Sequence, residues 1–496
     1  MSIQPQYETY RYTGEVARLQ SQSIVECRLP GSEVGGILSV QAKAVPTECI
    51  CADGEVRYNG RLVLCVVYED ADKKVCRMER GAEFFHKADG ADVTPACFAK
   101  TAFVVENVSH RREGSGLYLS VVVRAEISVY GGKQIEYLTG GENVCVDTQK
   151  LYTAKTVCVS GEVDAEDEFE SDYVGDILMH GAQAIATSVR AAAGEIQIEG
   201  EIVLHVCVLQ ADGGVHSYER LSPFKMQIQS EEAFENVRAW ARVFVKDAQI
   251  SASVDEEKGK SKLVYSYVLC ADCFVDSKDE LSAAFDAFSP IGELHLKTQN
   301  DGGRYLTNIM KCTERIGGEA ALSPTIQGEY FLQAAVQPMV EVACKKVENG
   351  VEAEGVLSAD VIMVGADGSH KSCTMRLPFV FPLHVENALD VEVDALVCGL
   401  NVRRKKGGET EAEATLKVCV RTFEKVEWAY ISQAEAGEIG EETDAAISIF
   451  LPCEGENLWQ VAKRLRRVPE ELVKSNPNLQ FPVKAGERIF VYRQIK

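Results

Sequence analysis

The chain has seventeen cysteines, whose thiolates could act as nucleophiles or as metal ligands. Cys270 and Cys273 form a C-x-x-C motif, and Cys49 and Cys51 form a C-x-C motif. A tetrahedral zinc site needs a second pair of ligands at suitable spacing, and none is near either motif in the sequence. Many cysteines lie in apolar runs, as Cys65 does in LVLCVVY, where a reduced thiol packs as a small apolar side chain. We therefore expect buried thiols and no metal.

The common catalytic motifs are missing from the sequence. It contains no G-x-x-x-x-G-K-[ST], no H-E-x-x-H and no G-x-S-x-G. Its eight histidines are scattered, and His205 lies in an apolar run that favours a structural imidazole. We predict no catalytic residues, no cofactor and no enzymatic activity. The alternative, a β-rich enzyme, would require distant titratable groups to gather in a cleft.

Length and charge limit the remaining classes of function. The chain has 496 residues, enough for three or four domains, and a net charge of −23. Such a charge repels phosphate backbones and anionic lipids, so we do not expect nucleic-acid or membrane-surface binding. The longest apolar run, Leu62 to Tyr68, is much shorter than a membrane span of about 20 residues. With no secretion signal at the start of the sequence, we expect a cytoplasmic protein without a transmembrane segment.

Three segments of the chain repeat one another. Aligned on Gly60, Gly200 and Gly355, each has an aspartate 12 residues later and a phenylalanine 24 residues later. The aspartates are Asp72, Asp212 and Asp367, and the phenylalanines are Phe84, Phe224 and Phe379. Because the glycines are 140 and 155 residues apart, each repeat has the size of a domain.

The repeats have the composition of β-strands. Runs rich in β-branched residues end at turns, and Asp212-Gly213 and Asp367-Gly368 are strong hairpin signals in which both residues can adopt positive φ. Long alternating strands without a helical period predict tandem antiparallel β-sandwich domains. The expected organisation is three β-domains at 1–145, 146–290 and 291–432, an acidic linker at 433–446, and a separate tail at 447–496.

The tail has a different pattern. A short extended run, Ile447 to Phe450, precedes Asn457, which suits the N-cap of a helix. The apolar stripe of that helix consists of Leu458, Val461, Ala462 and Leu465. Pro469 begins a second helix, which ends before Pro477, and Arg488 to Tyr492 form a last strand. The predicted order is strand, helix, helix, strand.

This tail resembles a LysM module, which shows a Gly-Asp-Thr-Leu-Trp opening, an Asn-Pro-Asn centre and a closing Gly turn. The LysM family folds as βααβ and binds N-acetylglucosamine glycans between two loops. The resemblance implies that the following residues bind glycan or another partner: Gly455, Glu456, Asn457, Leu458, Asn476, Pro477, Asn478 and Leu479. Glu456-Asn457 replaces the usual Asp-Thr, which changes the hydrogen-bonding groups of the first loop. Trp459 is expected in the small core of the module rather than as a sugar-stacking platform.

The tail is basic and the rest of the chain is acidic. Residues 447–496 carry nine basic and five acidic side chains, a net charge of +4, which leaves −27 for the remainder. A cluster of cations lies on and after the first predicted helix: Lys463, Arg464, Arg466 and Arg467. This cluster is interpreted either as a contact patch for an acidic protein or wall surface, or as a solvated helix face.

The three repeats resemble the SPOCS domain of clostridial spore-coat proteins, which has an extended run with a glycine, a hairpin turn and a later Pro-Phe. Pro223-Phe224 and Pro378-Phe379 match that pattern, whereas the first repeat has Glu83-Phe84. Tandem SPOCS-like domains followed by a LysM-like tail are similar to the architecture of spore-coat morphogenetic proteins.

That architecture implies a non-enzymatic scaffold for assembly of the endospore coat. The resemblance places such a protein in the mother-cell cytoplasm, recruited to the forespore surface. Its tail would dock on a coat morphogenetic protein, the ATPase-type component of the basement layer. The alternative is a protein of the wall or spore cortex that binds the N-acetylglucosamine glycan of peptidoglycan.

Overall fold

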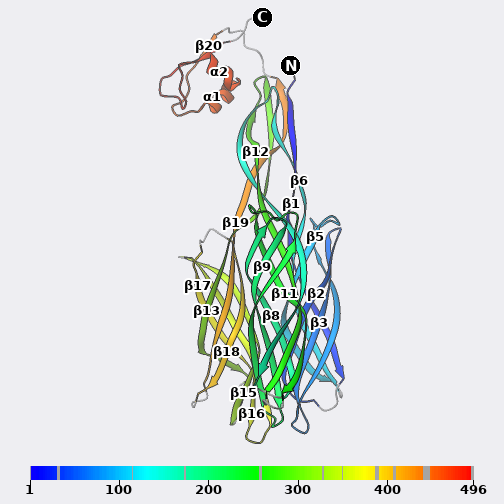
Figure 1. Cartoon of the computed structure of the whole chain (residues 1–496). Helices are drawn as coiled ribbons and strands as arrows, with labels where there is room; N and C mark the ends of the chain where they lie inside the picture. Colours follow the sequence, from blue (N-terminus) through cyan, green and yellow to red (C-terminus); the bar gives the residue numbers. More distant parts are fainter. Residues whose placement is uncertain are drawn as a thin grey trace.

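The computed structural model is mainly β, with antiparallel sheets and two short helices, as the composition of the repeats predicts. It describes residues 2–30, 34–113, 116–172, 175–255, 260–324, 326, 329–348, 350–385, 390–405, 409–439 and 447–492. Nineteen of its strands fall into three successive sets, which we call units 1, 2 and 3 (Figure 1).

The strands of each unit follow one another along the chain. Unit 1 contains β1 (Gln4–Pro30), β2 (Val34–Ala52), β3 (Glu55–Asp70), β4 (Val75–Asp89), β5 (Phe98–Glu113) and β6 (Gly116–Glu142). Unit 2 contains β7 (Cys145–Ser171), β8 (Gly175–Ala192), β9 (Glu195–Gln210), β10 (Val215–Gln229), β11 (Arg238–Asp255) and β12 (Lys260–Phe288). Unit 3 contains β13 (Gly292–Glu319), β14 (Ala321–Ser323), β15 (Tyr330–Val347), β16 (Gly350–Gly365), β17 (His370–Leu383), β18 (Asp390–Arg404) and β19 (Thr410–Ile439).

All three units share one topology. The long last strand pairs with the first strand on one side and with the preceding strand on the other, giving the orders β1-β6-β5, β7-β12-β11 and β13-β19-β18. The strands in between form a second, meandering sheet: β2-β3-β4, β8-β9-β10, and β15-β16-β17 with β14 at its edge. Every pair is antiparallel.

The two sheets of each unit bury their apolar side chains in a shared core. In unit 1, Leu64 of β3 and Leu119 of β6 are fully buried in one hydrophobic cluster. Equivalent clusters join β9 to β12 in unit 2 and β16 to β19 in unit 3. Strands of opposite sheets therefore stabilise each other through apolar contact rather than through hydrogen bonds.

The repeated glycine and phenylalanine are direct cross-strand partners. Gly60 pairs with Phe84, Gly200 with Phe224 and Gly355 with Phe379. A Cβ added to Gly60 would lie 2.4 Å from the ring of Phe84, and Gly200 and Gly355 are equally crowded at 2.4 and 2.5 Å. The glycine therefore makes room for the ring, and the spacing of 24 residues reflects the hairpin between them.

The turns of these hairpins differ in detail from the prediction. Gly213 and Gly368 have positive φ, of 86° and 78°, whereas the aspartates that precede them do not. The backbone N–H of Gly213 donates to the carbonyl of Gln210, and that of Gly368 to Gly365, as in a longer hairpin loop with one left-handed residue. Lys73 occupies the left-handed position in unit 1, with φ of 62°.

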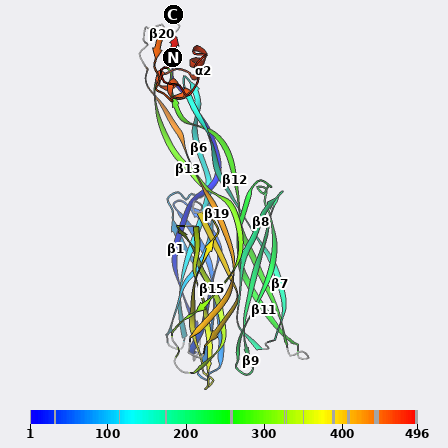
Figure 2. The ribbon, with the colours of Figure 1, turned by 90° about the vertical axis from the view of Figure 1, so that its left-hand side faces the viewer.

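The first and last strands of the units extend beyond the other strands as a common stalk (Figures 1 and 2). We define this stalk by residues 4–12, 133–142, 145–153, 279–288, 292–303 and 426–439. All three units contribute to its core, in which Tyr137, Leu151 and Trp428 are buried together. The segments that join one unit to the next lie at its tip, where Gln4 pairs with Glu142 and Cys145 with Phe288.

Half of the acidic linker expected at 433–446 belongs to a strand of the stalk. Residues 433–439 form the end of β19 and pair with β13, and 440–446 lie outside the described residues. Ile431 and Ala434 are buried inside the stalk while the acidic Glu435 and Glu438 are exposed. The acidic residues of this segment are thus compatible with a strand, because they lie on its solvated side.

The body below the stalk is also held together by apolar contacts between units. One buried cluster combines Cys65 and Val67 of unit 1 with Cys207 of unit 2 and Ile362 of unit 3. Cys419 is buried in another cluster, between units 2 and 3. These thiols are buried side chains, as predicted, but they line contacts between units rather than the core of one unit.

Packing of the glycines predicts a sharp contrast between two substitutions in one hairpin. Gly60→Ala should destabilise unit 1 by about 1–3 kcal/mol because the new methyl group collides with the rings of Phe84 and Phe103. Gly81→Ala, in the partner strand, meets nothing closer than 3.8 Å and should be neutral. Urea denaturation followed by circular dichroism compares the two, and equal stabilities would contradict the packing argument.

Candidate functional site

The tail forms a separate small module with its own core. Its elements are β20 (Ile447–Phe450), α1 (Leu458–Leu465), α2 (Pro469–Ser475) and β21 (Ile489–Tyr492), in the order expected from the sequence. Asn457 caps α1 through a reciprocal pair of hydrogen bonds with Gln460. Among the described residues, no helix is long and apolar enough to cross a membrane.

The first of the two loops implied by the resemblance is fixed by backbone bonds. Gly455 has φ of 87°, and its N–H donates to the carbonyl of Val483 over 2.9 Å. The N–H of Val483 in turn donates to the carbonyl of Glu456, also over 2.9 Å. Gly455 and Asn457 remain exposed, whereas Leu458 packs against the core of the tail.

In the second loop, one of the predicted binding residues has a structural role. The buried side chain of Asn476 accepts a hydrogen bond from the N–H of Phe490 and donates to the carbonyls of Phe490 and Leu472, at distances of 2.8 to 3.0 Å. These bonds join α2 to β21. Pro477 and Asn478 are exposed, and Leu479 packs in the tail core.

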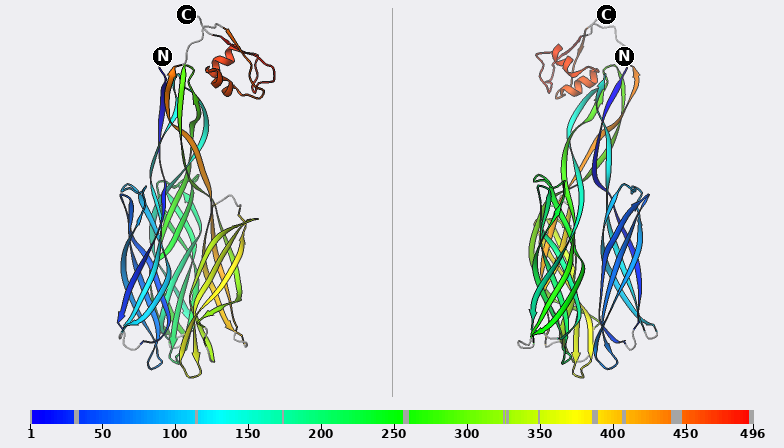
Figure 3. Two further views of the ribbon diagram at one scale, coloured as in Figure 1. Left: turned by 180° about the vertical axis from the view of Figure 1, so that it is seen from behind. Right: turned by 45° about the vertical axis from the view of Figure 1, so that its right-hand side comes forward.

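Trp459 links the tail to the tip of the stalk. Its indole N–H donates to a carboxylate oxygen of Asp286 over 2.8 Å, and its ring meets Phe288 edge to face with centroids 5.0 Å apart. Phe288 is buried in the same cluster as the tail core. The predicted core position of Trp459 is thus extended to a contact with unit 2. Figure 3 shows the tail beside the tip of the stalk.

The predicted basic cluster is largely engaged within the chain. Lys463 donates to Asp286 over 2.6 Å, and Arg466 lies 3.5 Å from a carboxylate oxygen of Glu293 in β13. Arg464 pairs with Glu456 inside the tail, and the backbone N–H of Arg467 donates to Ala462 at the end of α1. Although burial favours the neutral acid, Lys463 and Trp459 lower the pKa of Asp286. Nothing in the sequence distinguishes Asp286 and Glu293 from the other acidic residues.

A second assembly of charges lies where the three units meet. The carboxylate of Glu392 in β18 lies within 3.8 Å of four guanidinium groups. They belong to Arg18 of unit 1, Arg242 of unit 2, and Arg304 and Arg421 of unit 3. Burial alone would raise the pKa of Glu392, but Arg304, Arg421 and Arg242 lower it to about 2.

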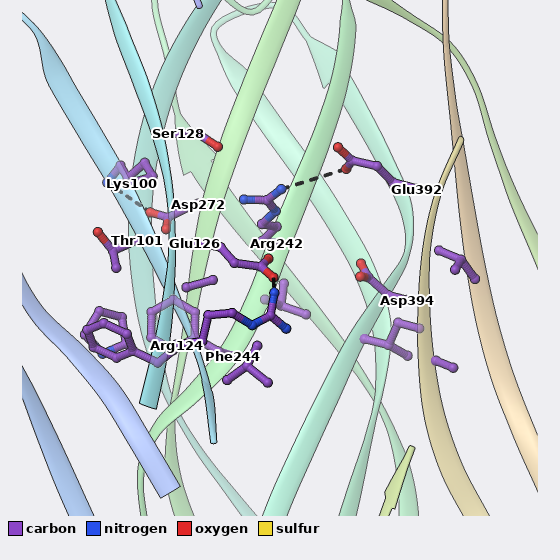
Figure 4. A pocket seen from close by; sticks show the side chains of 18 of the residues that line it. Lys100, Thr101, Arg124, Glu126, Ser128, Arg242, Phe244, Asp272, Glu392 and Asp394 are labelled. Carbon is purple, nitrogen blue, oxygen red and sulfur yellow. Dashed lines mark hydrogen bonds and ion pairs between the residues drawn. The ribbon is translucent and has the colours of Figure 1, made fainter. Parts of the chain in front are cut away.

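A large cavity of about 1290 Å³ lies beside this charge cluster, between the units (Figure 4). It is lined mainly by the same pair of strands from each unit: β2 and β5, β8 and β11, and β15 and β18. Figure 4 shows Lys100 of unit 1 directed at Asp272 of unit 2, with 2.9 Å between their charged atoms, and Arg242 directed at Glu392.

Titratable groups from distant parts of the sequence gather in this cavity, as a β-rich enzyme would require. Most of its charged side chains pair with one another, as Lys100 does with Asp272 and Arg124 with Glu126. Burial lowers the pKa of His205, which lines an adjoining chamber, to about 4, so its imidazole is neutral. Among the described residues, no group of three or more His, Cys, Asp or Glu side chains is arranged to hold a metal.

The Glu392 cluster predicts a specific pH dependence of stability. Because folding lowers the pKa of Glu392 from 4.5 to about 2, its contribution is present above pH 4.5 and is lost as the pH falls towards 2. Glu392→Gln should therefore destabilise the protein by about 3 kcal/mol at pH 7. Urea denaturation at pH 7 and pH 3 should show the difference from wild type shrinking. An unchanged difference would contradict the assignment, and Glu427→Gln, in an exposed pair with Lys425, is the control.

The contact between tail and stalk generates another prediction. Asp286→Asn should shift the indole N–H resonance of Trp459 and accelerate its exchange with solvent, because the amide is a weaker acceptor and no longer holds Lys463. Glu280→Gln, in the same strand but paired with Lys150, should leave that resonance in place. Identical spectra for the two variants would argue against the docked position of the tail.

Function must therefore be inferred from these two assemblies, the docked tail and the junction of the three units. Both join segments that are far apart in the sequence, and neither reproduces a known catalytic arrangement. Comparison of the chain with protein-family models, with curated proteins and with solved structures found no match to any of them.

Proposed function

We propose that this protein is a non-enzymatic scaffold in assembly of the endospore coat. The observation that carries the proposal is the arrangement of one small module at the tip of a stalk that all three units build together. Burial of apolar side chains between units makes the body one rigid support. The resemblance of the repeats and tail to SPOCS and LysM domains supplies the biological setting, the forespore surface in the mother cell.

The tail presents an apolar surface away from its own core. Ile447 pairs with Tyr492 and Ile449 with Phe490 across the two-stranded sheet, and we call these four residues the apolar ladder. Ile447 and Ile449 are 59% and 58% exposed, and Tyr492 is 53% exposed. Phe450, Ile489 and Val491, which neighbour these residues in the two strands, pack in the tail core. An exposed set of adjacent large apolar side chains is typical of a protein-binding surface.

This surface supports docking on a protein better than docking on a glycan. Isoleucine side chains offer a sugar no hydrogen bonds, and the basic residues expected to meet a partner are largely occupied by the stalk and the tail itself. We therefore assign the apolar ladder to the coat morphogenetic protein of the basement layer. The exposed Asn457, Pro477 and Asn478 support the alternative of peptidoglycan binding.

Binding measurements with purified components test the proposal. The double variant Ile449→Glu/Phe490→Glu should weaken binding of the full chain to the coat morphogenetic ATPase of the same organism by at least about tenfold. Val473→Glu, which changes an exposed apolar residue on α2, should bind within about threefold of wild type.

The outcome for glycan binding is measured with the same proteins. If wild type fails to bind the ATPase but sediments with purified peptidoglycan, and Asn478→Ala abolishes sedimentation, the glycan alternative replaces the scaffold. Binding to the ATPase that is unaffected by the double variant would remove the apolar ladder from the proposal.

A further inference from the structure

A smaller chamber of about 420 Å³ adjoins the central cavity and is also formed by all three units. It shares part of its lining with the cavity, including Lys43, Phe103 and Gln183. Apolar groups make up much of its remaining wall, namely Val105, Met179, Val206, Val336, Met339 and Leu400. Its volume lies within the roughly 300–1,000 Å³ of small-molecule sites, which are mostly apolar with a few convergent polar groups.

One cation in this chamber has no counter-ion. No carboxylate oxygen of the described residues lies within 4.0 Å of the Lys43 ammonium, whereas Lys100 in the neighbouring cavity is paired with Asp272. Burial lowers the pKa of Lys43 to about 8, and the more distant Asp247 offsets this effect only in part. An ammonium group in apolar surroundings is costly unless an anion pairs with it.

The repeats show that the fold itself does not need a cation here. Lys43 pairs with Val63, Gln183 with Val203 and Met339 with Ser358. Each partner lies three residues after the repeated glycine, so the three side chains occupy equivalent positions, and all three line the chamber. Units 2 and 3 build the same strand with an amide and a thioether. The strand therefore does not need a cation at this position in order to fold.

The other polar groups of the chamber include two imidazoles and one carboxylate. The Nε2 atom of His205 is buried without a hydrogen-bond partner among the described residues. His180 shares a hydrogen bond of 3.1 Å with the hydroxyl of Tyr265, and burial lowers its pKa. Glu219 accepts a hydrogen bond from the backbone N–H of Gly399. The unpaired ammonium of Lys43 therefore remains for a ligand in the chamber to satisfy.

We propose that this chamber binds a small apolar carboxylic acid, with its carboxylate on Lys43 and its hydrocarbon part among the apolar side chains of the three units. A monoanion matches the single unpaired cation. A dianionic phosphate would bring an extra negative charge close to Glu219 and is disfavoured. Because the chamber is formed by all three units, a bound acid would also stabilise their junction. This site is independent of the tail and of the proposed scaffold function.

Calorimetric titration of the full chain with octanoic acid and with 1-octanol tests the site, since the two probes share the hydrocarbon chain. At pH 7 the acid should bind at least tenfold more tightly than the alcohol. Lys43→Met should weaken binding of the acid at least tenfold while changing binding of the alcohol less than threefold. Lys225→Met, which removes an exposed lysine paired with Glu199, should match wild type for both probes.

Thermal denaturation distinguishes loss of the binding site from failure of a variant to fold. Lys43→Met should melt at or above the temperature of wild type because it removes an unpaired, partly buried charge. Lys43→Gln provides a second variant if Lys43→Met does not fold. Octanoic acid should raise the melting temperature of wild type and not that of the Lys43 variants. Equal affinity for acid and alcohol, binding of neither probe, or full binding of the acid by Lys43→Met would overturn the proposal.

Discussion

The three units meet around a single, partly buried carboxylate. Glu392 of unit 3 is surrounded by arginines from every unit, and only 18% of its side chain is exposed. Arg304 also covers the ring of Phe423 at 3.9 Å, and Trp240 stacks on Phe274 beside it, so the charges are enclosed by aromatic groups. Transfer of these charged groups out of water has a large desolvation cost. Such a cluster therefore contributes more to the geometry of the assembly than to its net stability. A different position of unit 2 would separate the Arg242 guanidinium from the Glu392 carboxylate, whereas Arg18 and Arg421 also pair with carboxylates of their own units.

This junction also determines which strand edges face solvent. Each unit is open between its two sheets at β2 and β5 or their equivalents, and these are the strands that line the central cavity. Unpaired strand edges are prone to pairing with other chains, and turning them towards one another hides them without closing a barrel. The cavity and the smaller chamber follow from the same arrangement, because strand edges that face each other across a junction do not interlock as closely as sheet faces.

Much of each unit can be predicted from the sequence, and much of the assembly cannot. The spacing of glycine and phenylalanine encodes a cross-strand pair, and Asn457 marks the start of α1. The continuous apolar run in β3 indicates a strand, and it also reflects burial of both faces of that strand. Leu62 and Leu64 point into the core of unit 1, while Cys65 and Val67 point into the contact with units 2 and 3. Burial on both faces of a strand gives an unbroken apolar run, but the run does not identify the partner on its second face. For the same reason, composition alone did not show that the acidic end of β19 completes the stalk.

The docked tail combines a modest attachment with a free binding face. Its polar contacts with the stalk are few and partly exposed, since the side chain of Lys463 is 44% exposed, and each such pair contributes about 1 kcal/mol or less. Those contacts use α1, whereas the apolar ladder lies on the outward side of β20 and β21. Docking on the stalk and binding of a protein partner thus use different surfaces of the same module. A partner that covers the ladder would therefore meet a tail that is already oriented, with the orienting contacts intact, and would not need to displace them.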